Sequence, residues 1–430
     1  MSKRAYDVIV WGSTGFTGRL CSEYFARQYP GGRGLRWAIA GRNGEKLSEL
    51  KAQLARNFNI ETDSIPTIVA SIDNEESMSR MAAQGKVVLS TAGPFDKFGT
   101  PVVHACVESG THYVDITGEP QWVRKIIDRY HGAATAKKLK IVPNCGFDCV
   151  PVDFGCDFMV SEMKNRGWSP VEVHQSLVKM KGGASGGTIA SALNVFDSCS
   201  REELKELRNP FALNPRQPDG TLDQPDDMMT RKAAQDRRNA TYDSLLKKWT
   251  VPFVMQAIDT RVVNRSNALG KWKYGKNFIY SESMAMPSQW KAYATALTAP
   301  IIFMLLYNKI TRPLVMSYLP SPGEGPSEAA RENGLFRFRS WARGIDQAGA
   351  VQMLKGEIDA PHGDGGYKQT SVMVCEAAIS LALDSDLDNG EGEGEEAPVI
   401  YGVLTPSIGL GMPYRKRLAS RPGITFRTLP

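Results

Sequence analysis

A short apolar run, Asp7–Trp11, ends at a glycine and leads into a segment with helical periodicity. Three glycines follow with the spacing G-x-x-G-x-x-G, at Gly12, Gly15 and Gly18. This pattern is typical of a buried first strand, a tight turn and a helix N-terminus. Gly12 would let the chain turn, Gly15 would let backbone N–H groups approach a pyrophosphate, and Gly18 would let the helix pack closely on the strand. The stretch predicts a dinucleotide-binding crossover, and the alternative is a loop that merely turns.

Further apolar runs alternate with helical patterns over the first 150 residues. The strands are expected at residues 36–40, 65–70, 86–92, 112–115 and 140–143. Strands that alternate with helices predict a doubly wound parallel sheet covered by helices. The predicted fold class is therefore α/β, with a Rossmann-type NADP-binding domain at residues 1–150.

The residue after the second predicted strand indicates which dinucleotide binds. NAD enzymes usually carry Asp or Glu there for the ribose 2′-hydroxyl. This chain has Gly41, Arg42 and Asn43 instead, with no carboxylate. A guanidinium suits the 2′-phosphate of NADP through paired hydrogen bonds and charge. We therefore predict NADPH over NADH, against the alternative that Arg42 is a solvated surface residue.

The expected cofactor residues lie in the glycine loop, after the second strand, and in the loops that follow the third and fourth strands. They are Gly12, Ser13, Thr14, Gly15, Phe16, Thr17, Gly18, Arg42, Asn43, Asp73, Ala92, Gly93 and Pro94. Asp73 is placed to reach the adenine edge, and the alternative is that it caps a helix.

A reductase also needs a group that protonates its substrate. No Tyr is followed four residues later by Lys, so the proton-donor pair of the short-chain dehydrogenases is absent. Candidate catalytic residues are Asp148, Asn144 and Tyr113, at the ends of the later strands. Asp148 is the first choice, although it could instead cap the helix that begins near Pro151.

Substrate contacts are expected from two further segments. The candidates are Cys145, Phe147, Ser185, Gly186 and Thr188. The last three belong to the glycine-rich run Gly182–Thr188, which could receive a substrate group or could be a close packing turn. Cysteines and histidines show no ligand spacing, so no metal site is predicted.

Several motifs together resemble the saccharopine dehydrogenase-like oxidoreductase family, including the eukaryotic saccharopine dehydrogenase-like oxidoreductases and the bacterial trans-acting enoyl reductases. They are Gly12–Gly18, Ala40–Arg42, Ala92–Phe95, Tyr113–Glu119, Cys145–Asp148 and Gly182–Thr188. The resemblance implies a Rossmann domain, a second α/β substrate domain and a nicotinamide-dependent reductase. It also implies a link to lipid metabolism and to lipid droplets or membranes.

The substrate domain is expected at residues 151–400. Residues 209–227 are expected to form an exposed loop, and residues 351–358 and 368–375 a hairpin that leads into a helix at 376–383. An acidic surface loop is expected at 384–396. Residues 401–430 are expected to form a C-terminal segment that packs back on the first domain.

Residues 292–308 form an uncharged segment between Lys291 and Lys309. Seventeen helical residues span about 25 Å, short of a hydrocarbon core of about 30 Å, and Pro300 would kink the helix. A full transmembrane helix is not expected. The segment could be an internal helix, a lid over an apolar substrate, or a contact with a membrane or lipid droplet.

Composition indicates which class of partner and which cellular compartment to expect. The net charge is +6 and the basic residues are scattered, which argues against nucleic acid. Seven cysteines without a C-x-x-C pair indicate reduced thiols in the cytoplasm, and no signal peptide precedes the first strand. A homodimer is compatible with these features.

These observations predict an NADPH-dependent reductase of a carbonyl or enoyl group on a lipid-like substrate. One alternative is a non-catalytic dinucleotide-binding protein associated with lipid droplets or membranes. Another is a saccharopine-type amino-acid reductase, which would need several cationic groups at its substrate site.

Overall fold

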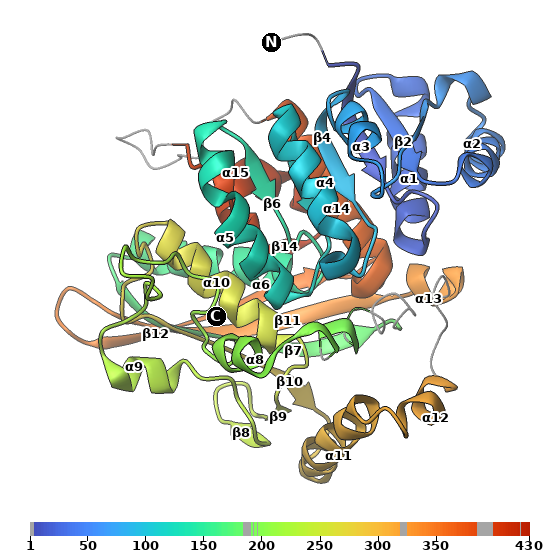
Figure 1. The fold of residues 1–430 in the computed structure, drawn as a ribbon. Helices are drawn as coiled ribbons and strands as arrows, with labels where there is room; N and C mark the ends of the chain where they lie inside the picture. Colours follow the sequence, from blue (N-terminus) through green and yellow to red (C-terminus); the bar gives the residue numbers. More distant parts are fainter. Residues whose placement is uncertain are drawn as a thin grey trace. The chain divides into compact units, whose positions relative to one another are not determined.

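The computed structural model describes residues 4–183, 191, 193–195, 197–318, 325–384, 399–421 and 423–430. The chain forms two compact units. The first contains Met1–Phe147, Gly323–Gly325 and Gly366–Pro422, and the second contains Asp148–Pro322, Pro326–Gly365 and Gly423–Pro430. Over the described ranges, each unit is built around a seven-stranded sheet of its own (Figure 1).

The sheet of the first unit is parallel throughout, in the order β13-β6-β5-β4-β1-β2-β3. Its strands are β1 (Tyr6–Trp11), β2 (Trp37–Gly41), β3 (Thr67–Val69), β4 (Gly85–Ser90), β5 (His112–Asp115), β6 (Lys140–Val142) and β13 (Gly402–Val403). The order reverses between β1 and β4, which is the Rossmann topology. The predicted fold class is confirmed.

Two series of packed helices cover this sheet. The helices are α1 (Phe16–Gln28), α2 (Gly44–Phe58), α3 (Glu75–Ala82), α4 (Phe95–Ser109), α5 (Pro120–Ala136), α14 (Thr370–Leu383) and α15 (Pro406–Ser420). The helix α14 packs against α1, α15 and the strands β1, β4 and β5, whereas α4 packs against α3 and α5. Right-handed crossovers that run in opposite directions from β1 and β4 place the two series on opposite faces.

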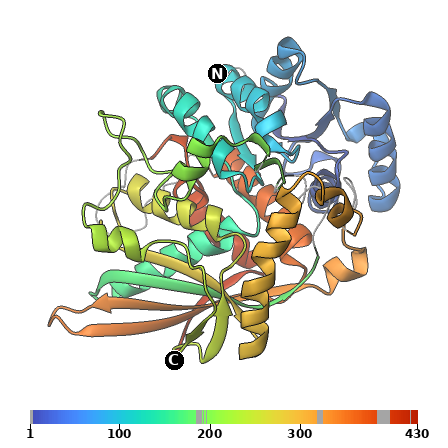
Figure 2. The same cartoon turned by 60° about the horizontal axis from the view of Figure 1, so that its bottom comes forward.

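The second unit has a mixed sheet, in the order β14-β12-β11-β7-β10-β9-β8. Its strands are β7 (Ser169–Lys181), β8 (Thr241–Asp243), β9 (Lys248–Val251), β10 (Ile279–Met286), β11 (Leu335–Ile345), β12 (Val351–Ala360) and β14 (Thr425–Leu429). Its helices are α6 (Cys149–Asn165), α8 (Arg201–Leu207), α9 (Met228–Ala233), α10 (Gln256–Leu269), α11 (Gln289–Tyr307), α12 (Arg312–Met316) and α13 (Glu328–Glu332). Figure 2 shows its long strands.

The prediction of a hairpin at residues 351–358 and 368–375 is wrong. The strand β12 pairs antiparallel with β11, and residues 370–383 form one helix, α14. Residues 372–375 are apolar without interruption, and such a run fits a buried strand and a buried helix equally well. Because α14 is buried on nearly all sides, it has no polar stripe to reveal its helical period.

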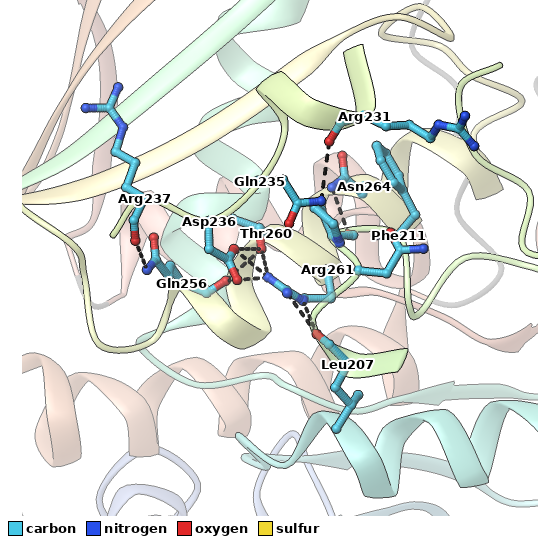
Figure 3. A network of polar contacts seen from close by, with 12 residues as sticks. Leu207, Phe211, Arg231, Gln235, Asp236, Arg237, Gln256, Thr260, Arg261 and Asn264 are labelled. Carbon is cyan, nitrogen blue, oxygen red and sulfur yellow. Dashed lines mark hydrogen bonds and ion pairs between the residues drawn. The ribbon is translucent and has the colours of Figure 1, made fainter. Parts of the chain in front are cut away.

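The predicted loop 209–227 is irregular, but part of it is buried. Phe211 is only 1% exposed. Side chains of α10 hold this segment and the end of α8 before it. Asn264 donates to the Pro210 carbonyl at 2.9 Å, and Arg261 donates from Nε and Nη2 to the Leu207 carbonyl at 3.1 and 2.8 Å. Arg261 also pairs with Asp236 at 2.6 Å (Figure 3). Backbone carbonyls bound to buried side chains therefore anchor the segment.

The units divide the chain differently from the sequence-based boundaries at 150 and 400. Residues 366–384 and 399–421 belong to the first unit. The last residues belong to the second, where β14 pairs with β12. Residues 385–396 of the expected acidic loop lie outside the described residues.

Candidate active site

The glycine loop joins β1 to α1 as predicted. Gly12 has a φ of +78°, which a residue with a side chain rarely adopts. Gly15 is the N-cap residue of α1, it supplies no side-chain cap, and the first turn of α1 contains no acidic residue. The N-terminus of α1 therefore keeps the partial positive charge that attracts phosphate.

Gly18 lets α1 approach the loop closely. A Cβ built at Gly18 would lie 2.2 Å from the carbonyl oxygen of Gly12 and 2.7 Å from the Cα of Ser13. Both distances are impossible for real atoms, and the obstacles are backbone. A side chain at this position would therefore displace the phosphate-binding turn.

Hydrogen bonds join the glycine loop to the ends of β2 and β4. The Ser13 backbone N–H donates to the Ala40 carbonyl at 3.2 Å, and its hydroxyl donates to the same oxygen at 3.1 Å. The Thr91 hydroxyl donates to the Gly12 carbonyl at 3.3 Å. A Cβ at Gly12 would lie 3.0 Å from the Cβ of Ala92. The structure thus brings the predicted loops together at the carboxyl edge of the sheet, where α/β folds bind dinucleotides.

Arg42, Asn43 and Asp73 occupy distinct positions at this edge. Arg42 is exposed directly after β2, so its guanidinium is available to an anion. The Asn43 side chain caps α2 by accepting the Lys46 backbone N–H at 2.9 Å. Asp73 is exposed and does not cap α3, because Asn74 does so by accepting the Ser77 N–H at 2.8 Å. The residues present at this edge fit an NADP phosphate.

Glu119 fixes the loop that contains Gly93 and Pro94. Its carboxylate oxygens accept the backbone N–H groups of Phe95 at 2.7 Å and Asp96 at 3.1 Å, at the first turn of α4. Glu119 is fully buried. A carboxylate at a helix N-terminus is favourable, so Glu119 positions this loop.

Tyr113, Asp115 and Asn144 form a buried group at the ends of β5 and β6. Asp115 accepts the backbone N–H groups of Thr117 at 2.9 Å and Asn144 at 3.0 Å. The Asn144 side chain donates to the Thr117 carbonyl at 2.6 Å. Burial raises the pKa of Asp115 to about 7, although these hydrogen bonds oppose the shift. Tyr113 and Asn144 are 0% and 3% exposed, so their side chains support the edge from within.

The substrate candidates fall into two groups. Cys145 and Phe147 are buried in the first unit, where the Phe147 N–H donates to the Thr370 hydroxyl at 3.0 Å. Ser185, Gly186 and Thr188 lie outside the described residues.

Asp148 begins the second unit, at the N-cap position of α6. Its side chain makes no capping hydrogen bond, so the alternative role as a helix cap does not apply. Burial raises its pKa to about 7. Burial therefore favours the protonated carboxyl, the form that a general acid requires.

Two carboxyl groups near Asp148 were not anticipated from the sequence. Asp259 of α10 and Glu282 of β10 are almost completely buried. Burial, followed by the charges of Glu282 and Asp148, raises the pKa of Asp259 well above its usual value. Burial also raises the pKa of Glu282. Both residues are single carboxylates in ordinary helix and strand patterns, so only the tertiary fold reveals the group.

Comparison with known proteins supports the cofactor assignment. Residues 8–142 match the family described as the saccharopine dehydrogenase NADP binding domain. This range contains the glycine loop, Arg42 and the loops after β3 and β4. NADP is therefore the cofactor that the first unit binds.

Full-length relatives extend the match beyond this domain. A protein of Mycobacterium tuberculosis provisionally named as a trans-acting enoyl reductase is 34% identical over 99% of this chain and 98% of its own length. The trans-acting enoyl reductase of Mycobacterium leprae is 30% identical over 97% of this chain and 96% of its own length.

A solved structure shares the fold. The apo saccharopine dehydrogenase (L-Glu forming) of Saccharomyces cerevisiae matches with a TM-score of 0.51 and 12% identity, over 99% of this chain and 100% of that chain. Identity this low shows the fold alone, whereas the full-length relatives show the family. The chain belongs to the saccharopine dehydrogenase-like, NADP-binding oxidoreductase family that includes the trans-acting enoyl reductases.

Proposed function

We propose that this protein is an NADPH-dependent reductase of an enoyl group on a lipid-like substrate. One observation carries the proposal: the phosphate-binding turn and exposed Arg42 share one sheet edge, in a chain whose full-length relatives are named enoyl reductases. A carbonyl group remains the second substrate class that this chemistry would accept.

The proposed reaction assigns the proton to Asp148. The reduced nicotinamide, when bound, supplies a hydride. Reduction of a carbon–carbon double bond also needs a proton at the other carbon, which the Asp148 carboxylic acid would donate. The resulting carboxylate would then recover its proton from solvent. A pKa of about 7 for Asp148 suits both steps at neutral pH.

The lipid-like substrate and the place of action belong to the same proposal. Acyl chains are held in membranes and lipid droplets, and residues 292–308 are the segment proposed to contact such a surface from the cytoplasm. Their exposure in α11 supports this assignment, because large apolar side chains gathered on a surface mark interaction sites.

The experiment is steady-state NADPH oxidation with long-chain 2-enoyl thioesters, and with the saturated thioesters as blanks. We expect turnover by the native protein and a loss of kcat in Asp148→Asn of at least about 100-fold, the usual scale of general acid catalysis. Asp226→Asn is the matched control, because Asp226 is exposed in the same unit. It should retain full turnover.

Two outcomes would favour the alternative functions. Tight NADPH binding without turnover across enoyl and keto substrates would indicate a non-catalytic dinucleotide-binding protein. Turnover restricted to amino-dicarboxylate substrates would indicate a saccharopine-type reductase.

A further inference from the structure

The helix α11 is apolar and almost entirely exposed. Among its residues only Ala292 is buried. Its large exposed apolar side chains are Trp290, Tyr293, Leu297, Ile301, Ile302, Phe303, Met304 and Tyr307. Among the described residues, α11 is the helix whose length and composition would allow it to cross a membrane. The following helix, α12, continues the surface between Ile310, which is 88% exposed, and Tyr318, which is 83% exposed.

Exposure covers most of the helix surface, while residues 292, 295, 296, 299 and 306, which lie at helical spacing, are buried or half-buried on one side. Four consecutive residues, Ile301–Met304, point in directions about 100° apart and so sample nearly every side. Their exposed fractions are 46%, 50%, 39% and 63%. An apolar surface this wide, beyond the single stripe of an amphipathic helix, needs apolar surroundings over most of its circumference. Acyl chains provide such surroundings.

Aromatic and basic residues surround the N-terminal end of α11. Tyr293 packs on Trp249 of β9 with ring centroids 5.5 Å apart, and Trp249 packs on Tyr242 of β8 at 5.6 Å. The exposed lysines of this region are Lys247, Lys248 and Lys291. Trp and Tyr prefer the headgroup level of a bilayer, and lysines there attract anionic lipids. We call these six residues the collar.

The C-terminal end of α11 has its backbone satisfied by side chains. The Thr311 hydroxyl donates to the Leu305 carbonyl at 2.6 Å, and Arg312 Nε donates to the Leu306 carbonyl at 2.7 Å. Arg312 also pairs with Asp197 at 2.7 Å. Backbone groups that enter lipid must be bonded internally, and these bonds meet that requirement.

The topology of the second unit excludes a single crossing. The strands that precede and follow this segment, β10 and β11, both pair with β7. A helix that crossed the bilayer once would place them on opposite sides. The Tyr293–Trp249 and Arg312–Asp197 contacts also hold both ends of α11 to the same unit.

We propose that α11 and α12 insert lengthwise into one leaflet of an anionic phospholipid bilayer, with the collar at headgroup level and no crossing of the membrane. This inference rests on the membrane contact included in the proposed function and names the lipid and the mode of insertion; lipid binding by α11 and α12 requires neither substrate nor cofactor.

Vesicle flotation of the full chain tests the proposal. The probes are phosphatidylcholine vesicles with and without 30% phosphatidylserine, a composition chosen for this assay. We expect the native protein to float with the anionic vesicles. The partition coefficient onto these vesicles should fall at least about tenfold, or about 1.4 kcal/mol, in Leu297→Asp/Ile301→Asp. Met228→Asp is the matched control, because Met228 is 71% exposed on α9, and it should float like the native protein.

Labelling tests the absence of a crossing. Single cysteines introduced at Lys248 and Lys309, in a Cys199→Ser background, should both react with a membrane-impermeant maleimide added outside the vesicles. Protection of one site only would overturn the proposed topology.

Three results would overturn the lipid assignment. They are absence of flotation, flotation only with triacylglycerol-cored particles, and a lipid-free dimer that Leu297→Asp/Ile301→Asp dissociates. The last result, measured by light scattering, would assign the surface to a second copy of this chain. NADPH oxidation with the long-chain 2-enoyl thioesters, followed on the same samples, separates each of these failures from a failure of the proposed reductase.

Discussion

Two helices of similar composition have opposite surroundings in this protein. In α14, residues 373–382 are buried without interruption. In α11, Ala292 alone is buried. The one acidic residue of α14, Glu376, is paired with Arg417 at 3.2 Å. The comparison teaches that an apolar helix without a polar stripe specifies apolar surroundings, and not whether protein or lipid provides them.

The largest loss of folding stability is expected from a charge placed in α14. Ile379 is 0% exposed in the core of the first unit. Ile379→Asp should lower the free energy of unfolding by more than about 4 kcal/mol, because it buries an unpaired carboxylate. Thermal unfolding and NADPH binding measure the result.

A milder change keeps this prediction measurable if Ile379→Asp does not fold. Ile379→Ala should cost about 2–5 kcal/mol through the cavity it leaves. A loss under about 0.5 kcal/mol would show that α14 is less tightly packed than described.

The cofactor turn of the same unit should respond to one methyl group. Gly18→Ala would place its Cβ 2.2 Å from the Gly12 carbonyl oxygen. We expect the displaced turn to weaken NADPH binding by at least about tenfold, or about 1.4 kcal/mol, by calorimetric titration. Gly132→Ala is the matched control, because a Cβ there meets no atom within 4 Å. Equal affinities for the two variants would contradict the geometry of the turn.

The second unit should show a pH dependence that originates at Asp148. Its pKa of about 7 means that the acid form, the proposed donor, is lost as pH rises through 7. The kcat should therefore fall above neutral pH, and this limb should be absent from residual turnover by Asp148→Asn. A pH profile of kcat that is identical in both proteins would remove Asp148 from the reaction.

The same group has a consequence for stability. The folded state holds a proton on Asp148 at pH values where the unfolded chain, with a pKa of about 3.9, has lost it. The contribution of Asp148 to stability therefore declines as pH rises from about 4 to about 7. Asp148→Asn should remove this part of the pH dependence in urea unfolding curves.

The smallest change in folding stability is expected from a charge placed in α11. Leu297 is 69% exposed, so Leu297→Asp should change the free energy of unfolding without lipid by less than about 0.5 kcal/mol. Thermal unfolding of Leu297→Asp and Ile379→Asp, measured side by side, compares the two helices directly. A loss above about 2 kcal/mol would show that α11 is a core helix, as Leu→Ala changes in cores cost this much.

The sequence was sufficient for the cofactor edge of the first unit because the signals of this edge are local. The run Asp7–Gly18 contains strand, turn and helix start in twelve consecutive residues. The position of Arg42 directly after β2 likewise needs no distant contact. The expected residues of this edge are brought together by hydrogen bonds between neighbouring loops.

The other features depend on contacts between distant segments. The helix α14 was divided between a strand and a helix because a fully buried element has no periodic polar face. Asp259 and Glu282 reach Asp148 only when α10 and β10 pack in the second unit. The surroundings of residues 292–308 could not be predicted, because only the structure shows that Ala292 alone among the residues of α11 is buried.

Titration of the native protein with NADPH and NADH tests the central claim, that the edge beside β1 and β2 binds a phosphorylated dinucleotide. We predict that NADPH binds at least about tenfold more tightly than NADH, a difference of about 1.4 kcal/mol. Arg42→Ala should remove this preference, since a hydrogen bond to a charged group contributes about 1.5–3 kcal/mol, while Arg56→Ala, at the far end of α2, should not. Equal affinities in the native protein, or an Arg42→Ala variant that keeps the preference, would contradict the account.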